Sequence, residues 1–347
     1  MTGTTTRLLW VDAVKCIAIF CVLWGHCIQH LAEGEMGKNS VFLFIYSFHM
    51  PLFMILSGFF ADKLLKRRFR QVFTAKSLQL VFPAVVWGAA LFLVWRLLFP
   101  DGPHSVIRVL WYSFWFLKSL FVCVLLFIVG ARILCPRVWL GLSLVFLAVQ
   151  LVDFEPHLSI LQIRYMFPCF LLGYAFKCFQ TEFDRCAAAV ALTSGVCFLL
   201  LLPSWNQELM WPKINFFKMS VFPGCDTICG QLYTVYYKLL IGAAGGVFAL
   251  ASIRLLCAKL PGAFLEKAGA IGKHTLGIYI LQTFILEVLI KEYADFSGTG
   301  IYLFSLVYAP VLSAAVLWCC VEICRFCERS GLGWLFDFNK FNQGRHS

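Results

Sequence analysis

Long apolar stretches recur along this chain and limit what it can fold into. They run for about 16 to 26 residues, close to the roughly 20 that a helix needs to cross a bilayer core. Only 14% of the residues are charged, against about a quarter in an ordinary soluble domain, which excludes soluble and disordered chains. The sequence therefore predicts an all-α, polytopic membrane helix bundle. The ten predicted spans are 8–30, 40–60, 78–99, 110–133, 138–153, 159–178, 186–203, 232–257, 269–290 and 301–324.

Basic residues are distributed unevenly between the predicted loops. With a cytoplasmic N-terminus, the cytoplasmic segments hold eighteen Lys and Arg and the outer loops hold five. Because basic loops stay on the cytoplasmic side, both termini are predicted to be cytoplasmic. This asymmetry accounts for most of the net charge of +11 without a nucleic-acid partner. We expect a single transmembrane domain over 1–347, with a basic cytoplasmic tail over 325–347.

Sixteen cysteines occur in the chain, and many of them lie within apolar stretches. Such cysteines behave as small buried hydrophobic residues rather than as a disulfide framework. Cys225 and Cys229, in a polar loop, are the one pair for which a disulfide is worth testing.

The first predicted span carries a stripe of polar side chains. Lys15 and His26 are eleven residues apart, about three helical turns, so both side chains lie within roughly 20° on one face. Asp12 lies one turn before Lys15, while Gln29 and His30 lie one turn beyond His26. Because polar groups are costly inside a membrane span, they are candidates for function. The charged end is cytoplasmic, and His26 lies about 16 Å further along the helix axis.

This layout suits transfer of a group from a large anionic donor. Asp12 and Lys15 would anchor the donor at the cytoplasmic mouth, and His26 would take a proton from a hydroxyl group near neutral pH. The alternative is that Asp12 and Lys15 form only an interfacial ion pair, while His26 hydrogen-bonds a neighbouring helix. Both interpretations fit the spacing.

A proline in the second span directs attention to His49. Pro51 lacks a backbone N–H and disturbs the carbonyl of Ser47, which predicts a kink close to His49 and space for a ligand. Alternatively, His49 satisfies the freed backbone or orients another side chain.

The loop over 61–77 is strongly basic. Its six cations include Arg67, Arg68 and Lys76, which could bind phosphate groups of a donor through charge-assisted hydrogen bonds. A run of this kind is also the ordinary signal of a cytoplasmic loop.

Four stretches together resemble the membrane acyltransferase-3 family of glycan O-acetyltransferases, in particular its branch similar to fucose 4-O-acetylases. Their order and spacing cover the first nine spans. They are the Lys15-to-His26 spacing, the segments FHMPLF at 48–53 and LSGF at 56–59, WFL at 115–117 and LGIY at 276–279.

The resemblance implies a ten-helix enzyme that transfers an acyl group, commonly acetyl, from cytoplasmic acyl-CoA to a sugar hydroxyl. The acceptor would be an extracytoplasmic, cell-surface or lipid-linked glycan. The family assigns catalysis to the histidine that corresponds to His26, and associates a basic residue, here Lys15, with it. A direct transfer and an acyl-histidine intermediate both remain open.

Two positions depart from the pattern of this family. Members often carry Arg-x-x-Arg before the third span, whereas this chain has Lys76-Ser-Leu-Gln79, which keeps one positive charge and loses the other. The ninth-span motif often continues to a histidine, whereas this chain has Gln282, which hydrogen-bonds but cannot exchange a proton near neutral pH.

Further side chains are candidates for acceptor binding. The basic ones, Lys118 and Arg164, could hold an anionic acceptor, although they could equally snorkel to an interface or pair with an acid. The set that we expect to bind the acceptor is Trp115, Lys118, Arg164, Tyr279 and Gln282.

The most favoured function is thus a membrane O-acyltransferase with His26 as general base, His49 nearby and no metal, located in a bacterial inner membrane. Two other classes use the same polar groups differently. One is a transporter or flippase for a glycan precursor or small anion, and the other is a membrane partner in a glycan-synthesis complex.

Overall fold

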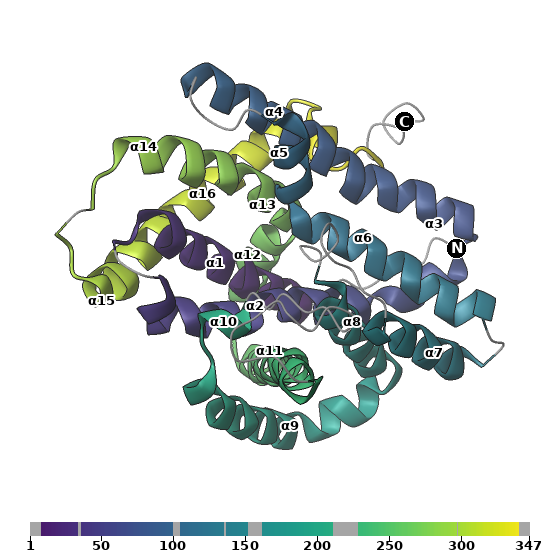
Figure 1. Cartoon of the computed structure of the whole chain (residues 1–347). Helices are drawn as coiled ribbons and strands as arrows, with labels where there is room; N and C mark the ends of the chain where they lie inside the picture. Colours follow the sequence, from purple (N-terminus) through teal and green to yellow (C-terminus); the bar gives the residue numbers. More distant parts are fainter. Residues whose placement is uncertain are drawn as a thin grey trace.

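The structure of the chain is a computed structural model that describes residues 8–33, 36–99, 105–134, 137–151, 162–210, 228–296 and 298–339. Every regular element in these ranges is a helix, which confirms the predicted fold class (Figure 1). The α-helices are α1 (Leu9–Leu31), α2 (Ser40–Phe59), α3 (Phe69–Lys76), α4 (Phe82–Leu98), α5 (Val106–Tyr112), α6 (Trp115–Ile128), α7 (Val138–Leu151), α8 (Ile163–Cys178), α9 (Gln180–Leu201), α10 (Gln207–Met210), α11 (Ile228–Cys257), α12 (Gly262–Gly272), α13 (Thr275–Thr283), α14 (Lys291–Tyr293), α15 (Ile301–Leu303) and α16 (Ala309–Arg329).

Several of these helices join into longer stretches. Short π-helical turns connect α3 to α4, α13 to α14 and α15 to α16. Within the described ranges, seven stretches are long and apolar enough to cross a membrane, or eight if α12 and the stretch from Thr275 to Tyr293 form one bent span. The described residues of each predicted span overlap helices, and the chain is a multi-pass membrane protein. The count of ten and the cytoplasmic termini stay predictions, and Cys225 lies outside the described residues.

The structure differs from the predicted spans at several helix ends. The third stretch begins at Phe69 rather than 78, because the π-helical turn carries the helix across Ser77–Val81. The fourth predicted span is divided, because Phe114 takes a left-handed backbone with φ of 51° between α5 and α6. The ninth predicted span is bent by 54° between α12 and α13. The last helix runs to Arg329, into the segment that the sequence predicts as a tail.

Helix α2 lies at the centre and packs against α1, α8 and α11. Its crossing with α8 is close because both helices present a glycine. A Cβ atom added to Gly58 would lie 1.8 Å from the carbonyl oxygen of Phe170, and one added to Gly173 would lie 1.9 Å from that of Ile55. Small residues of this kind let membrane helices approach backbone to backbone. The crossing therefore holds α2 directly against α8.

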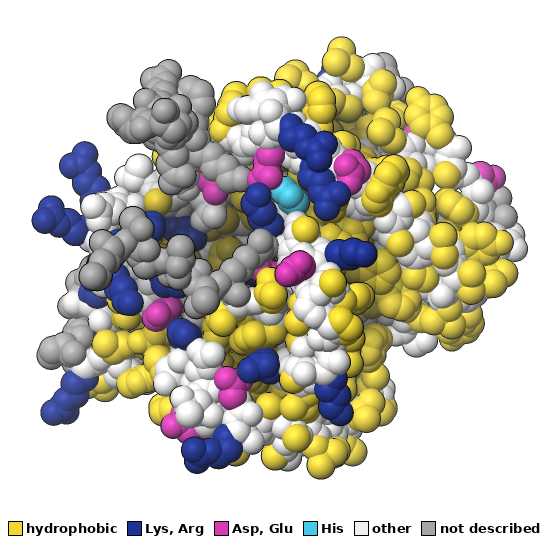
Figure 2. All heavy atoms as spheres, turned by 180° about the vertical axis from the view of Figure 1, so that it is seen from behind, with side chains coloured by type: hydrophobic (Ala, Val, Ile, Leu, Met, Phe, Trp, Pro, Cys, Tyr) yellow, Lys and Arg dark blue, Asp and Glu magenta, His cyan; other side chains and the backbone are white. Residues whose placement is uncertain are grey.

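The outer surface is rich in large apolar side chains. Leu97 on α4 and Leu200 on α9 are 80% and 75% exposed. Figure 2 shows hydrophobic side chains covering much of one side of the molecule, while charged side chains gather elsewhere. Such a continuous apolar surface is what lipid tails would cover.

Candidate active site

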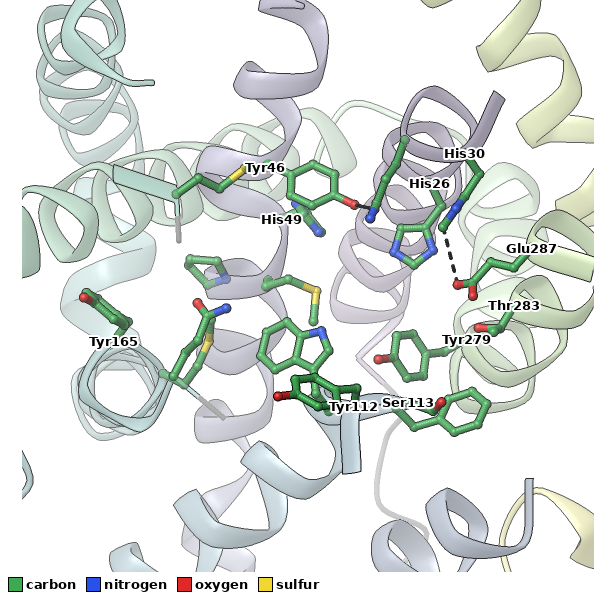
Figure 3. Close-up of a pocket in the computed structure, with 18 of the residues that line it drawn as sticks. His26, His30, Tyr46, His49, Tyr112, Ser113, Tyr165, Tyr279, Thr283 and Glu287 are labelled. Carbon is green, nitrogen blue, oxygen red and sulfur yellow. Dashed lines mark hydrogen bonds and ion pairs between the residues drawn. The ribbon is translucent and has the colours of Figure 1, made fainter. Parts of the chain in front are cut away.

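His26 lines a cavity of about 580 Å³ in the described part of the bundle. We call it the His26 cavity. Its walls come from α1, α2, α8, α11 and α13 and from the segment around α5. Figure 3 shows His26, His30 and Glu287 on one side of this cavity and Tyr165 on the opposite side. Residues distant in sequence therefore face one space.

Hydrogen bonds fix the orientation of the His26 imidazole. Its Nδ1 lies 3.0 Å from Oε1 of Gln282. The amide nitrogen of Gln282 donates to Thr283 Oγ1 at 3.0 Å and to the carbonyl of Tyr279 at 3.4 Å, so the amide oxygen must face His26. Nδ1–H then donates to Gln282, because an amide oxygen only accepts. This tautomer leaves Nε2 of His26 as the basic nitrogen.

A carboxylate and a second histidine lie beside His26. His30 Nε2 is 3.4 Å from Oε1 of Glu287, and the rings of His26 and His30 meet edge to face with their centroids 5.8 Å apart. On the same helix face, Gln29 accepts a hydrogen bond from the hydroxyl of Tyr46. The polar stripe expected on the first span is thus met by polar groups from α2 and from the helix after α13.

His49 also lines the His26 cavity, and it is buried. Its Nδ1 donates to the carbonyl of Ile45 at 2.7 Å, and its ring lies 4.8 Å from that of Tyr46. Helix α2 continues as one helix across Pro51, and the carbonyl that His49 holds is not the one that the proline disturbs. His49 therefore faces the cavity and bonds the backbone at the same time.

A second cavity, of about 340 Å³, adjoins the first, and we call it the middle cavity. It shares two wall residues with the His26 cavity, Met50 and Tyr279. Apolar side chains from α1, α2, α6 and α8 form most of its wall, and the amines of Lys15 and Lys76 line it as well. Met50 and Tyr279 thus form the partition between an apolar space and the polar space around His26.

The third cavity, of about 980 Å³, is the Lys15 cavity. It shares five wall residues with the middle cavity: Lys15, Phe60, Gln79, Thr275 and Leu276. Lys15 pairs with Asp12 at 3.2 Å, and its ammonium lies 5.2 Å from the centre of the Phe60 ring. The three cavities therefore adjoin one another in series, from Lys15 to His26.

The remaining predicted donor residues differ in position. Lys76 lies on the middle cavity and donates to Gln79 Oε1 at 2.7 Å, and Gln79 reaches Asp337 at 3.4 Å. Arg67 and Arg68 are exposed and line none of the three cavities.

The predicted acceptor residues also separate into two groups. Trp115 and Tyr279 line the His26 cavity, and Gln282 holds His26 from behind. Lys118 instead donates to the carbonyl of Leu110 at 2.8 Å, which ties α6 to the end of α5. Arg164 is buried but lines none of the three cavities.

Two charged residues of this cavity are absent from the predicted site. Glu287 is a carboxylate inside an apolar span, which is itself a signal of function. Lys238 is a cation inside an apolar span, and like Lys118 and Arg164 it could hold an anionic acceptor. It lines the His26 cavity near Tyr165, where its ammonium lies 4.7 Å from the ring centre and donates to Gln162 Oε1 at 2.7 Å.

Comparison with known proteins gives a consistent result. Residues 8–324 match the acyltransferase domain of the acyltransferase-3 family. Nodulation protein NolL of Mesorhizobium japonicum is 30% identical over 344 residues, which cover 91% of this chain and 86% of that protein. Nodulation protein NolL of Sinorhizobium fredii is 30% identical over 337 residues, with 91% and 89% covered. No solved structure matches the chain.

Proposed function

The chain belongs to the acyltransferase-3 family, and on that premise we propose that it moves an acetyl group from acetyl-CoA to a hydroxyl of a glycan, with His26 as general base. The family and the enzyme class that the motifs predicted are thereby confirmed, which favours the enzyme over a carrier or an assembly partner. The observation that carries the proposal is the series of cavities that joins Lys15 to an oriented His26.

The donor enters through the Lys15 cavity. The phosphates of CoA bind near Lys15, which Asp12 positions, and the largely uncharged pantetheine arm lies along the apolar wall of the middle cavity. Lys15 and His26 are about 16 Å apart along the helix, a span that an extended pantetheine arm can bridge. The thioester then lies at the partition between Met50 and Tyr279. Lys76 assists within the middle cavity, whereas Arg67 and Arg68 act only from the surface.

The acceptor occupies the His26 cavity. Trp115 and Tyr279 provide aromatic faces on which a sugar ring can stack, and the histidines, Gln29 and Glu287 provide hydrogen-bonding groups. A space of about 580 Å³ is ample for the sugar that reacts. With the N-terminus inside a bacterial inner membrane, this cavity faces outward and receives an extracytoplasmic or lipid-linked glycan.

Transfer requires one proton to move twice. Nε2 of His26 takes the proton of the acceptor hydroxyl while its oxygen attacks the thioester carbonyl. The carbon–sulfur bond then breaks, and protonated His26 gives this proton to the CoA thiolate that leaves. The products are an acetyl ester of the acceptor and the free thiol of CoA. Gln282 supports both steps because it holds the hydrogen of the imidazole on Nδ1.

The test is acetyl transfer in cells that produce the chain or its His26→Ala variant, measured as acetylated surface glycan by mass spectrometry. We expect a loss of about 100-fold or more, the range of a missing general base. Cys27→Ala is the matched control, because Cys27 is the next residue of α1, is buried and lines none of the three cavities. Full activity of His26→Ala at normal expression would refute the proposal.

A further inference from the structure

Three side chains in the His26 cavity converge on one point. His26, His30 and Glu287 each offer one ligand atom, and these three atoms lie within 4.8 Å of one another. The two histidines are four residues apart on α1, so both imidazoles project from one face of the helix. Figure 3 shows Glu287 approaching them from the opposite helix. We call these residues the His26 cluster.

The chemistry of this cluster selects a particular kind of ion. Two imidazole nitrogens and one carboxylate oxygen form a ligand set typical of zinc and similar divalent transition metals. Magnesium and calcium prefer sites built from oxygen alone. The three side chains would have to close on the ion, because zinc binds nitrogen and oxygen at roughly 2.0 to 2.2 Å and their ligand atoms lie up to 4.8 Å apart.

The hydrogen bond between Gln282 and His26 also favours metal binding by His26. Histidines that bind metals almost always donate their other ring N–H to a carbonyl, a carboxylate or water, which fixes the tautomer and strengthens the ligand. Gln282 Oε1 accepts from Nδ1 of His26 at 3.0 Å and is itself held by Thr283. This bond leaves the lone pair of the His26 ring on Nε2, and Nε2 of His30 lies 3.4 Å from Oε1 of Glu287.

We propose that the His26 cluster binds a divalent transition-metal ion such as Zn²⁺, and that the bound ion blocks acyl transfer. The ion would use the Nε2 lone pair that His26 needs to take a proton from the acceptor. It would also fill the space beside His30 and Glu287. The inhibitory part rests on the proposed function of His26, whereas metal binding does not.

The charges in the same cavity permit such an ion. Glu287 supplies one negative charge, and neutral imidazoles supply the other ligands. The ammonium of Lys238 also lines the cavity, but it lies at the Tyr165 end, across the cavity from the His26 cluster. Lys238, which with Arg108 is one of the two cations among the described residues that line this cavity, is thus separated from the proposed site.

Metal binding is tested on the full chain purified in detergent, with Co²⁺ as the probe because its visible absorption reports its ligands. We expect a cobalt band in the wild type, competed away by Zn²⁺, and an affinity at least about tenfold weaker in His30→Ala and Glu287→Gln. His49→Ala is the matched control, because His49 lines the same cavity outside the cluster. An unchanged affinity in His30→Ala, or an absorption band that shows cysteine ligands, would overturn the site.

Inhibition is tested by titrating Zn²⁺ into an acyl-transfer assay on membranes, with each variant compared with its own metal-free rate. We expect Zn²⁺ to inhibit the wild type, a chelator to restore the rate, and His30→Ala to need at least about tenfold more Zn²⁺ for the same fractional loss. Equal inhibition of both proteins, or activation by Zn²⁺, would overturn the inhibitory role. Activity of His26→Ala would instead refute the proposed base and leave the cobalt result unaffected.

Discussion

The two ends of helix α1 line cavities whose walls are built differently. At the His26 cavity, each imidazole is oriented by a specific partner, Gln282 for His26 and Glu287 for His30. At the Lys15 cavity, lysines pair with acids: Lys15 with Asp12 one turn earlier on the same helix, and Lys273 with Glu328 of α16. The His26 end of α1 therefore presents oriented hydrogen-bonding groups, whereas the Lys15 end presents charged side chains.

This difference predicts which kinetic constant depends on the His26 end of α1 and which depends on the Lys15 end. Oriented groups that touch the reacting atoms affect the chemical step and therefore kcat, whereas flexible charges that hold a remote part of a substrate affect its binding. We therefore expect substitutions near His26 to lower kcat, and substitutions near Lys15 to raise the KM for acetyl-CoA. The following substitutions test that division.

The largest expected effect, apart from that of His26 itself, is at Gln282. Gln282→Leu removes the acceptor that keeps the imidazole hydrogen on Nδ1, so we expect kcat to fall roughly 10- to 100-fold with little change in the KM for acetyl-CoA. Steady-state kinetics with varied acetyl-CoA measure both constants. A rise in the KM for acetyl-CoA at unchanged kcat would assign Gln282 to donor binding. It would contradict the prediction that substitutions near His26 lower kcat.

A smaller effect is expected at Lys15. Lys15→Ala removes one charge-assisted contact to the donor, which corresponds to about a tenfold rise in the KM for acetyl-CoA. Lys273→Ala provides the comparison, because Lys273 lines the same cavity but not the middle one. An unchanged KM in Lys15→Ala would exclude Lys15 from donor binding.

Thr283 offers a finer test of the orientation of His26. Thr283→Val keeps the shape of the side chain and removes the hydroxyl that holds the amide of Gln282. A neutral hydrogen bond contributes about 1 kcal/mol, so we expect kcat to fall about fivefold. If Thr283→Val in the Gln282→Leu background lowers kcat by the same factor again, the two residues act independently and the orienting chain is wrong.

The smallest effect is expected at the exposed basic loop. Arg67→Ala and Arg68→Ala should each change the KM for acetyl-CoA by less than about twofold, because exposed charges contribute little and are screened by salt. A change as large as that of Lys15→Ala would move the donor site from the Lys15 cavity to this loop.

Features within one helix could be predicted well from the sequence. The first span was expected over 8–30 and is Leu9–Leu31, and Lys15 and His26 both face cavities. This follows because the apolar length of a span and the period of a helix depend on local sequence alone.

Contacts between distant helices could not be predicted in the same way. Gln282 and Glu287 reach α1 because α12 and α13 meet at a bend of 54° and because α12 approaches α1 closely. A Cβ atom added to Gly272 would lie 2.4 Å from the carbonyl oxygen of Asp12, so this approach depends on a glycine. Nothing in the pattern of either helix reveals that contact by itself.

The position of Lys118 shows a further limit. A lysine close to Trp115 in an apolar span predicts a ligand-binding role, which stays a prediction, whereas its bond to the carbonyl of Leu110 near the end of α5 has no signal in the sequence. The left-handed turn at Phe114 places that carbonyl within reach, and a phenylalanine gives no sequence signal for such a turn.

The central claim is that donor and acceptor meet at the partition between Met50 and Tyr279, within reach of His26. A cryo-electron microscopy structure of the chain with a non-transferable acetyl-CoA analogue tests it most directly. The account predicts CoA phosphates in the Lys15 cavity and the acyl end at Met50 and Tyr279. An acyl end remote from that partition, or an analogue bound only at the surface near Arg67 and Arg68, would contradict it.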